Sequence, residues 1–295
     1  MVAASIDWEV VVNLAEQFSE HSVTSLDLNR YVLVDAGASV RDVVGAMNDA
    51  GHTCAIVSRG EGPIGIVTDR DVLTRVVGYP TTWDMPVETV MTPDPEAVPA
   101  DGSVADALEM MNLFRFRNVP VVDGAGVLVG NLDRFAFLAF AADLLFSDAS
   151  IETHQLAAQH ALLFVDFTGL NLPAPVTVTP DTDLKRVVHT MRGRGIGSVL
   201  VADERGQNLG IFTDHDAQTK VACRIDNLGS VEIAGVMTES PLTLEVRQPI
   251  ADGLRLMYQE RISHIPLMGS GAGPVAVISF RDLADYLEST FVSMA

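Results

Sequence analysis

The sequence predicts a mixed α/β protein in which one strand, helix, strand, strand, helix unit occurs four times. The strongest observation is a repeated heptad, because GIVTDRD from Gly65 and GIFTDHD from Gly210 agree at five of seven positions. Weaker copies start at Gly130 and Ala276, so consecutive starts are 65, 80 and 66 residues apart. Two near-equal spacings around a longer one indicate two pairs of repeats joined by a linker.

The first copy shows the order of elements. Residues 31–35 form a short apolar run that predicts a strand, and Ser39 is placed to cap the helix that follows. Apolar residues recur at helical spacing in that helix: Val40, Val43, Val44 and Met47. Two further strands are expected at 53–58 and 64–68, and a second helix follows Asp71.

The third copy repeats this order. A strand is expected at 176–179, and Thr182 is placed to open a helix. The apolar positions of that helix are Leu184, Val187, Val188 and Met191. Strands at 198–202 and 209–213 complete the unit.

The second and fourth copies carry two further features. Val-Met-Thr precedes each of them, at 90–92 and 236–238. A proline, Pro120 or Pro266, falls early in the first strand after the helix, and we expect it at a strand start or edge, where proline is tolerated.

Two apolar stretches lie outside the repeats. Residues 6–18 predict an amphipathic helix packed on the first pair, and residues 135–172 predict a helical linker between the halves or at a subunit contact. The expected organisation is an N-terminal helix in 1–27, a first pair in 28–139 (repeats 28–80 and 88–139), a linker in 140–172, and a second pair in 173–295 (repeats 173–228 and 233–290).

Composition excludes several classes of function. The net charge is −20, with 19 basic against 39 acidic residues, which disfavours nucleic acid and anionic membranes as partners. The longest apolar stretch, 135–146, contains Asp143 and is too short to span a bilayer, and MVAASIDWEV lacks the basic start of a signal peptide. We therefore expect a cytoplasmic protein without membrane insertion. Cys54 and Cys223 have no metal or disulfide spacing and are expected to be core residues.

The heptad Gly-hydrophobic-x-Thr/Ser-x-x-Asp, repeated in pairs after a strand and a helix, resembles the cystathionine β-synthase (CBS) domain. The chain resembles a tandem of four such domains from about Leu28 to Leu287, apart from the linker. The resemblance implies that repeats pair about a pseudo-twofold axis into a Bateman module with two clefts. It also implies that the clefts take AMP, ADP, ATP, adenosine or S-adenosylmethionine as a regulatory ligand, and that the module regulates a partner.

The Thr/Ser-x-x-Asp segment suits a nucleoside chemically. It lies where a strand becomes a helix, so backbone N–H groups face outward and favour anions. A carboxylate three residues on can accept hydrogen bonds from vicinal ribose hydroxyls, while the Thr or Ser hydroxyl can donate to a phosphate or ribose oxygen. The alternative is that Thr68, Thr213 and Ser279 only cap their helices.

The resemblance implies that each Thr/Ser-x-x-Asp segment, called a junction below, faces the start of the first strand after the helix in the paired repeat. The three resulting clefts are Thr68 and Asp71 with Phe116, Arg117 and Asn118; Thr213 and Asp216 with Ile262, Ser263 and His264; and Ser279 and Asp282 with Ile196, Gly197 and Ser198. The fourth cleft departs from the pattern, because Asp133 replaces the hydroxyl and Ala136 the aspartate. We expect it to be empty.

Arg117 would give the Thr68 cleft a fixed positive charge, which ranks that cleft first for a charged nucleotide. In the other two clefts, His264 is expected to be largely neutral at pH 7 without a bound anion, and Arg281 is the only evident cation.

Other classes of function remain as alternatives. An enzyme is disfavoured because the chain lacks P-loop, GxSxG and HExxH motifs, so no catalytic or metal residues and no required cofactor are assigned. A Mg²⁺ sensor would fit the acidic composition, and a structural adaptor with vestigial clefts would fit the repeats. We expect a homodimer and a regulated protein partner whose identity the sequence leaves open. It also leaves open whether the two modules close into a disc within one chain or between chains.

Overall fold

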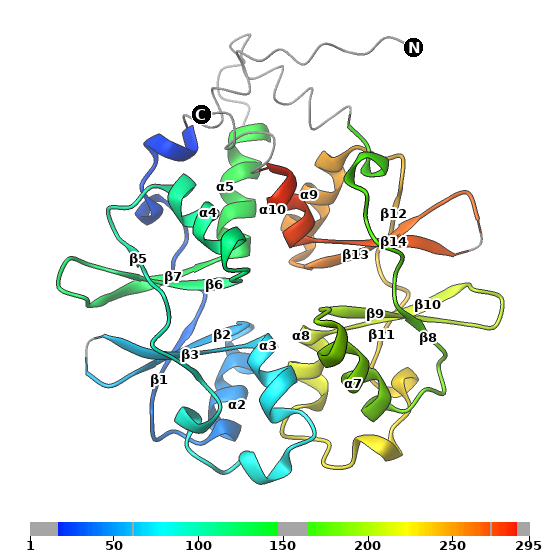
Figure 1. Ribbon diagram of the computed structural model, residues 1–295, viewed down its shortest axis with the longest axis horizontal. Coiled ribbons are helices and arrows are strands. Elements are labelled where there is room, and N and C mark those ends of the chain that lie inside the picture. Colours follow the sequence, from blue (N-terminus) through cyan, green and yellow to red (C-terminus); the bar gives the residue numbers. More distant parts are fainter. Residues whose placement is uncertain (1–16, 61, 147–164, 272, 288–295) are drawn as a thin grey trace.

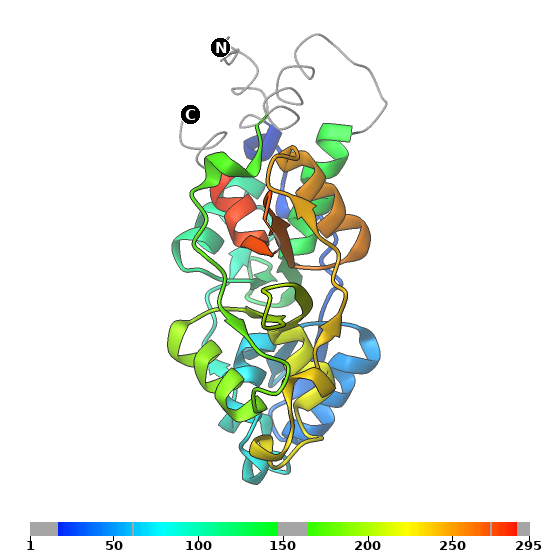
Figure 2. The ribbon, with the colours of Figure 1, turned by 90° about the vertical axis from the view of Figure 1, so that its right-hand side faces the viewer.

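The protein is a flat disc of four α/β units in the computed structural model, which describes residues 17–60, 62–146, 165–271 and 273–287. Each unit occupies one quadrant of the disc (Figure 1). The edge-on view shows that the four units form a body much thinner than it is wide (Figure 2). The predicted fold class, four paired repeats of mixed strand and helix, is confirmed.

The odd-numbered units each contain a four-stranded mixed sheet. In both, the first strand pairs in parallel with the second, and the second pairs antiparallel with the third. The first unit comprises β1 (Val32–Asp35), α2 (Val40–Ala50), β2 (Cys54–Ser58), β3 (Pro63–Thr68), α3 (Asp69–Asp71) with a π-helical turn (Val72–Val76), and β4 (Thr92–Pro93). The third unit comprises β8 (Thr177–Val178), α7 (Leu184–Arg194), β9 (Ser198–Ala202), β10 (Asn208–Thr213), α8 (Asp214–Asp216) with a π-helical turn (Ala217–Val221), and β11 (Thr238–Glu239).

The even-numbered units each contain a three-stranded sheet and longer second helices. The second unit comprises β5 (Val98–Pro99), α4 (Val104–Leu113), β6 (Asn118–Val122), β7 (Leu128–Asp133) and α5 (Arg134–Phe146). The fourth comprises β12 (Leu244–Glu245), α9 (Ile250–Glu260), β13 (His264–Met268), β14 (Pro274–Ser279) and α10 (Phe280–Leu287). Short 3-10 turns lie before the first unit, at Val23–Ser25, and between units, at Pro80–Thr82, Val87–Thr89, Phe167–Leu170, Leu228–Ser230 and Ile233–Gly235.

Two local predictions were wrong. Thr182 does not cap α7, because the carboxylate of Asp183 accepts the hydrogen bond from the N–H of Arg186, and the hydroxyl of Thr182 lies 3.1 Å from that of Thr179. Pro120 is the third residue of β6 and Pro266 is the third residue of β13, rather than the first. The neighbouring β5 pairs only with Val121 and Val122, and β12 only with Leu267 and Met268, so each proline lies beyond the reach of that neighbouring strand.

A left-handed residue follows the first helix of every unit and turns the chain into the strand that faces a cleft. The four residues are Gly51 (φ 65°), Arg115 (φ 59°), Gly195 (φ 66°) and Arg261 (φ 54°). Two of them are arginines, which adopt this conformation less readily than glycine. The turn brings residues 52–54, 116–118, 196–198 and 262–264 to equivalent positions in the four units.

The hydrophobic cores join units from different modules. One core combines buried residues of the first and third units, among them Met47, Leu73, Met191 and Phe212. The other combines those of the second and fourth units, for example Leu138 and Leu254. Within the first pair, Cys54, Ile56 and Ile66 of one sheet pack with Leu128 of the other. The two modules therefore close into a disc within one chain, which resolves one of the alternatives that the sequence left open.

The segment before each pair packs on the even-numbered unit of that pair. Val23 N donates to the carbonyl of Gly102 at 2.9 Å, and Ile250 N donates to the carbonyl of Val165 at 2.9 Å. Phe18 is buried in the core of the second and fourth units. The rest of the predicted 6–18 helix, and most of the linker predicted after Phe146, lie outside the described residues.

Candidate functional site

In each Thr/Ser-x-x-Asp junction, the aspartate accepts hydrogen bonds from the Thr or Ser three residues earlier. At the end of β3, one oxygen of Asp71 accepts from the N–H of Thr68 at 2.9 Å and from its hydroxyl at 2.7 Å. At the end of β10, the N–H and the hydroxyl of Thr213 each donate to Asp216 at 2.8 Å. Ser279 does the same with Asp282, at 2.7 and 2.5 Å. These capping contacts fix the orientation of each carboxylate.

The Val-Met-Thr segments supply a partner for the second oxygen of two of these carboxylates. The hydroxyl of Thr92 donates to Oδ1 of Asp71 at 3.1 Å, and that of Thr238 donates to Oδ1 of Asp216 at 2.8 Å. The same two oxygens also form ion pairs with cations of the following helical turn. Arg75 lies 3.4 Å from Oδ1 of Asp71, and Lys220 lies 2.8 Å from Oδ1 of Asp216.

Oδ1 of Asp282, in contrast, receives no hydrogen bond from any residue that the structure describes. Asp282 is therefore the most available of the three carboxylates for a ribose. The Val-Met-Thr repeat is visible in the sequence, but the role of its threonine is not, because the contact spans about twenty residues of chain.

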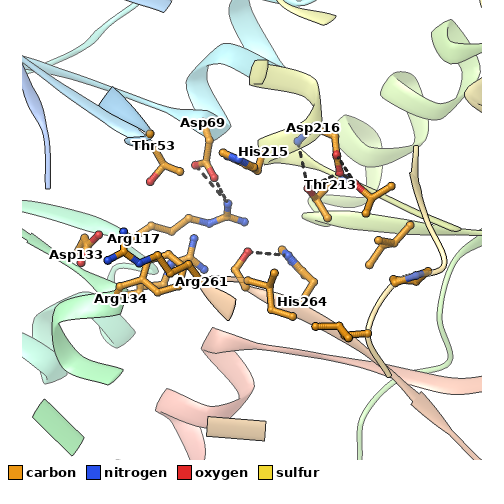
Figure 3. A pocket seen from close by; sticks show the side chains of 18 of the residues that line it. Thr53, Asp69, Arg117, Asp133, Arg134, Thr213, His215, Asp216, Arg261 and His264 are labelled. Atoms are coloured by element: carbon orange, nitrogen blue, oxygen red, sulfur yellow. Dashed lines mark hydrogen bonds and ion pairs between the residues drawn. The ribbon is translucent and has the colours of Figure 1, made fainter. Parts of the chain in front are cut away.

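A large pocket of about 420 Å³ lies at the centre of the disc, between the two modules (Figure 3). It brings together the predicted residues Thr213, Asp216, Ile262, Ser263 and His264. The first module contributes Arg30, Thr53, Asp69, Arg117, Asp133 and Arg134. The predicted Thr213 cleft is thus continuous with the fourth cleft, the one that lacks the aspartate. Its volume falls within the usual range of ligand sites, roughly 300 to 1,000 Å³.

A small pocket of about 230 Å³ contains the whole of another predicted cleft. Its lining includes Ser279, Asp282, Ile196, Gly197 and Ser198. Gly197 is required here by close approach, since a Cβ atom would lie 2.7 Å from Nε2 of His264 and 2.9 Å from a guanidinium nitrogen of Arg117. Arg117, Arg134 and His264 line both pockets, and Arg281 lines the small one.

The Thr68 cleft is the third of the predicted clefts. Thr68 and Asp71 line neither of the two pockets, and Asn118 accepts a hydrogen bond from Asn131 at 3.0 Å. The guanidinium of Arg117 pairs with Asp69 at 3.3 Å and with Asp214, across the module boundary. The ranking of this cleft first for a charged nucleotide stays a prediction, although the two buried carboxylates hold Arg117 at the centre of the disc.

Burial and neighbouring charges set the ionisation of the central groups. Burial, reinforced by Asp214, raises the pKa of Asp69. Burial opposes ionisation of Asp214 too, but Arg117 holds the pKa of that carboxyl below its usual range. The two carboxylates in turn raise the pKa of Arg117 despite its own burial.

His264 is a titratable base that lines both pockets. Burial lowers the pKa of His264 to about 4, so the ring is neutral near pH 7, as expected. Its Nδ1 lies 3.0 Å from the hydroxyl of Ser263.

Several pocket residues were missed from the sequence. Thr53, Asp69 and Arg134 are examples, and Arg134 had a readable signal. It occupies the heptad position held by Asp69 and Asp214 in the odd-numbered repeats, so the charge there is reversed. In the parts of the chain that the structure covers, no group of three or more His, Cys, Asp or Glu is arranged for a metal ion. No helix among those same residues is long and apolar enough to cross a membrane.

Comparison with known proteins identifies the repeats. The family model described as "CBS domain" matches residues 23–78, 87–143, 170–222 and 232–289. A CBS domain-containing protein of Arabidopsis thaliana, CBSCBSPB1, is 25% identical over 286 residues, covering 88% of this chain and 52% of the relative. An uncharacterized 33.4 kDa protein from the ribosomal RNA operon of Thermofilum pendens is 28% identical over 191 residues, covering 64% of this chain and 62% of the relative. The chain thus spans about half to three fifths of the length of these relatives.

A solved structure shows the same arrangement of four units. Protein MJ1225 of Methanocaldococcus jannaschii, proposed as an archaeal homologue of g-AMPK, superposes with a TM-score of 0.75 at 16% identity, covering 90% of this chain and 99% of that one. The family matches cover most of the sequence, one for each observed unit. The chain therefore belongs to the CBS domain family and contains four CBS domains.

Proposed function

We propose that this chain is a non-catalytic ligand sensor that binds an adenosine-type ligand in clefts between paired CBS repeats. The ligands that we consider are AMP, ADP, ATP, adenosine and S-adenosylmethionine. The observation that carries the proposal is the small pocket, in which the Ser279 and Asp282 junction of one repeat lies opposite residues 196–198 of its partner. Membership of the CBS family supports it.

The lining of the small pocket matches the parts of a nucleoside. Oδ1 of Asp282 has acceptor capacity for ribose hydroxyls. Ile196 and Val277, with Pro173 and Pro175, offer apolar surface for a flat base, and Arg281 lies at the same junction. The large pocket repeats the arrangement with Thr213 and Asp216, although a ribose there has to compete with Thr238 and Lys220 for the carboxylate.

The Ser263 and His264 contact is the feature of the pockets closest to a catalytic pair. Two facts favour a binding role for it. The low pKa of His264, about 4, makes the ring a weak base near pH 7, and the ring is buried.

Signalling follows from the shared construction of each cleft. A ligand that contacts two repeats at once favours the conformations in which both sets of contacts are made. Each repeat also shares its helical core with a repeat of the other module, so a change of angle within one module is transmitted to the other. We propose that this change is read by a protein partner in the cytoplasm. The homodimer expected from the sequence stays a prediction, to be tested by light scattering.

Calorimetric titration tests the proposal. The protein is titrated with adenosine, AMP, ATP and S-adenosylmethionine, and separately with Mg²⁺. We expect Asp282→Asn to weaken binding at the small pocket about tenfold or more, because a charge-assisted hydrogen bond contributes roughly 1.5 to 3 kcal/mol. Asp49→Asn, at an exposed position on α2, is the matched control and should leave binding unchanged.

The outcomes separate the alternatives. Binding of Mg²⁺ alone would replace the proposal with a cation sensor, and absence of binding by every ligand would favour a structural adaptor. Adenosine-type binding that survives Asp282→Asn together with Asp216→Asn at full affinity would reject the assigned clefts.

A further inference from the structure

A further cavity lies on the helical side of the disc, where α7 contacts the π-helical turn of the first unit (Figure 1). Its volume is about 590 Å³, which suits a small ligand. The α7 wall carries Lys185, Arg186 and Arg192, and the facing loops are residues 78–79 of the first unit and 226–229 of the third. None of its lining residues lines the large or the small pocket, so this α7 groove is separate from the clefts between junctions.

The α7 groove is cationic, although the chain as a whole is strongly acidic. Its three cations face two carboxylates, those of Asp183 and Asp226, whereas the chain has 19 basic and 39 acidic residues. Asp183 is already used as the cap of α7, because its carboxylate accepts from the N–H of Arg186 at 2.8 Å. The exposed side chains of Lys185 and Arg186 form no ion pair with any residue that the structure describes. Both therefore remain available to an anion in the groove.

Arg192 is the fixed cation of the α7 groove. Its Nε and Nη2 donate to the carbonyl of Leu73 at 3.0 and 2.7 Å, and Nη2 also donates to the carbonyl of Val77. The guanidinium carbon lies 4.9 Å from the centre of the Tyr79 ring, which is 46% exposed. Nη1 makes no hydrogen bond within the described ranges, so it keeps donors for a ligand. Arg192 and Tyr79 thus present positive charge beside a flat aromatic surface.

The repeat allows this groove to be compared with the same place in the first unit. The first N–H of α2 donates to the carbonyl of Met85 at 2.9 Å, and the first N–H of α7 donates to the carbonyl of Val231 at 2.8 Å. The loops before these two carbonyls are therefore equivalent. The residue two positions earlier is Trp83 in the first unit and Gly229 in the third.

In the first unit, this place is filled by the protein itself. The side chain of Trp83 is buried, and the guanidinium carbon of Arg41 lies 5.2 Å from its ring centre. Arg41 also donates to the carbonyl of Cys223 in the third unit at 3.1 Å, so it closes the gap between the units. At α7, a Cβ atom on Gly229 would meet nothing closer than 3.5 Å, and Lys185 makes no contact like that of Arg41. The α7 groove is thus an open counterpart of a place that an indole and a cation occupy at α2.

We infer that the α7 groove is a second type of binding site, which takes an aromatic carboxylate: a planar ring that carries a carboxylate on a short chain. The ring takes the place that the Trp83 indole holds in the first unit and lies against Tyr79. The carboxylate pairs with Lys185 and Arg186, and Arg192 adds the donors of its Nη1. The inference goes beyond the proposed function, since it requires no adenosine and no residue of the clefts.

Calorimetric titration with indole-3-acetate tests the site, because this probe joins an indole ring to a carboxylate. Tryptamine, which has the ring with a cation, and acetate, which has no ring, should bind the wild type at least tenfold more weakly. The double variant Lys185→Ala, Arg186→Ala should weaken indole-3-acetate about tenfold or more, because it removes two charge-assisted contacts. Arg194→Ala, at an exposed position on α7 outside the groove, should leave binding unchanged. A wild type that does not bind indole-3-acetate, or a double variant that binds it equally well, would overturn the inference.

Gly229→Trp tests the comparison between the two units. The new side chain has room at its Cβ atom and should fill the groove as Trp83 fills its counterpart, so indole-3-acetate binding should be lost. Gly124→Trp, at an exposed hairpin glycine with open space, is the matched control and should retain binding. Titration with AMP reads the clefts separately, so failure of the adenosine proposal does not affect this result. A folded Gly229→Trp variant that binds indole-3-acetate as the wild type does would overturn the inference, and if that variant does not fold, the Lys185 and Arg186 double variant decides.

Discussion

His264 is the first residue of β13, is 9% exposed, and lines both pockets. Its neighbours include Asp214 and Asp216, which favour a proton on the ring, and Arg117 and Arg134, which oppose it. Burial outweighs all of them and lowers the pKa from 6.5 to about 4. His264, which the sequence alone presents as a possible cation, therefore lines the site as a neutral polar residue.

This burial predicts a pH dependence of stability. The unfolded chain binds the proton of His264 near pH 6.5 and the folded chain only near pH 4, so the free energy of unfolding falls as the pH drops through this window. Over the whole range between the two pKa values, His264 lowers the free energy of unfolding by about 3 kcal/mol. His264→Gln should make urea unfolding less dependent on pH between 6.5 and 4. His189→Gln, at an exposed position on α7, should keep the wild-type dependence, and an unchanged slope in His264→Gln would contradict the burial argument.

At this scale the sequence predicted pairs of residues better than the directions of long side chains. The junctions at 213–216 and 279–282 do face the strand starts that the resemblance indicated. The destination of Arg117 was missed, because it depends on Asp69 and Asp214, two carboxylates from different modules. Arg134 was missed because only the fold brings the first residue of α5 to the wall of both pockets.

At the scale of elements, each odd-numbered repeat packs closely against the Val-Met-Thr segment that follows it. Gly65 on β3 leaves room for the side chain of Met91, and Gly210 on β10 leaves room for Met237, whose Sδ would lie 2.5 Å from an added Cβ atom. The glycine at the start of the heptad therefore recurs in both odd-numbered repeats for a steric reason. The threonine that follows each methionine then reaches the carboxylate of the junction.

A double-mutant cycle tests this fit. Gly65→Ala should lower the free energy of unfolding by about 1 to 3 kcal/mol, because the new methyl group overlaps Met91. In the Met91→Ala background the same substitution should cost much less, since the obstacle is a side chain. Gly45→Ala, on α2 with open space around the new Cβ atom, is the control and should be neutral or slightly stabilising. Equal costs of Gly65→Ala in both backgrounds would show that Met91 is not the cause.

Helices and strands followed the apolar periodicity closely, since the observed β2, β3, β9 and β10 differ from the predicted spans by at most one residue at either end. The two wrong predictions, the cap of α7 and the position of the proline in β6, depend on neighbouring residues and strands. Asp183 outcompetes the adjacent Thr182 as a cap, and Pro120 is accommodated within a strand because β5 is only two residues long. Neither outcome can be read from residue preference alone, because each depends on where a neighbouring element ends.

At the scale of the whole molecule, the two modules share both of their helical cores, which the repeat pattern could not show. Periodicity identifies an apolar helix face but not the face that covers it. The structure pairs the helices of the first unit with those of the third, and the helices of the second with those of the fourth. A buried polar contact marks the same boundary, as the amide of Gln218 donates to Asn48 and to the carbonyl of His52, both at 3.0 Å.

Separating the modules should therefore expose two apolar helix faces on each. We expect a fragment of residues 17–146 to self-associate at micromolar concentration, because patches of this kind are seldom left open to water. A fragment of residues 165–290, which retains the segment packed on Ile250, should behave in the same way. Mixing the two should produce a one-to-one complex with the mass of a single disc, measured by light scattering after size exclusion, because the heterologous faces fit each other. Two fragments that stay monomeric and separate after mixing would show that the shared cores do not hold the disc together.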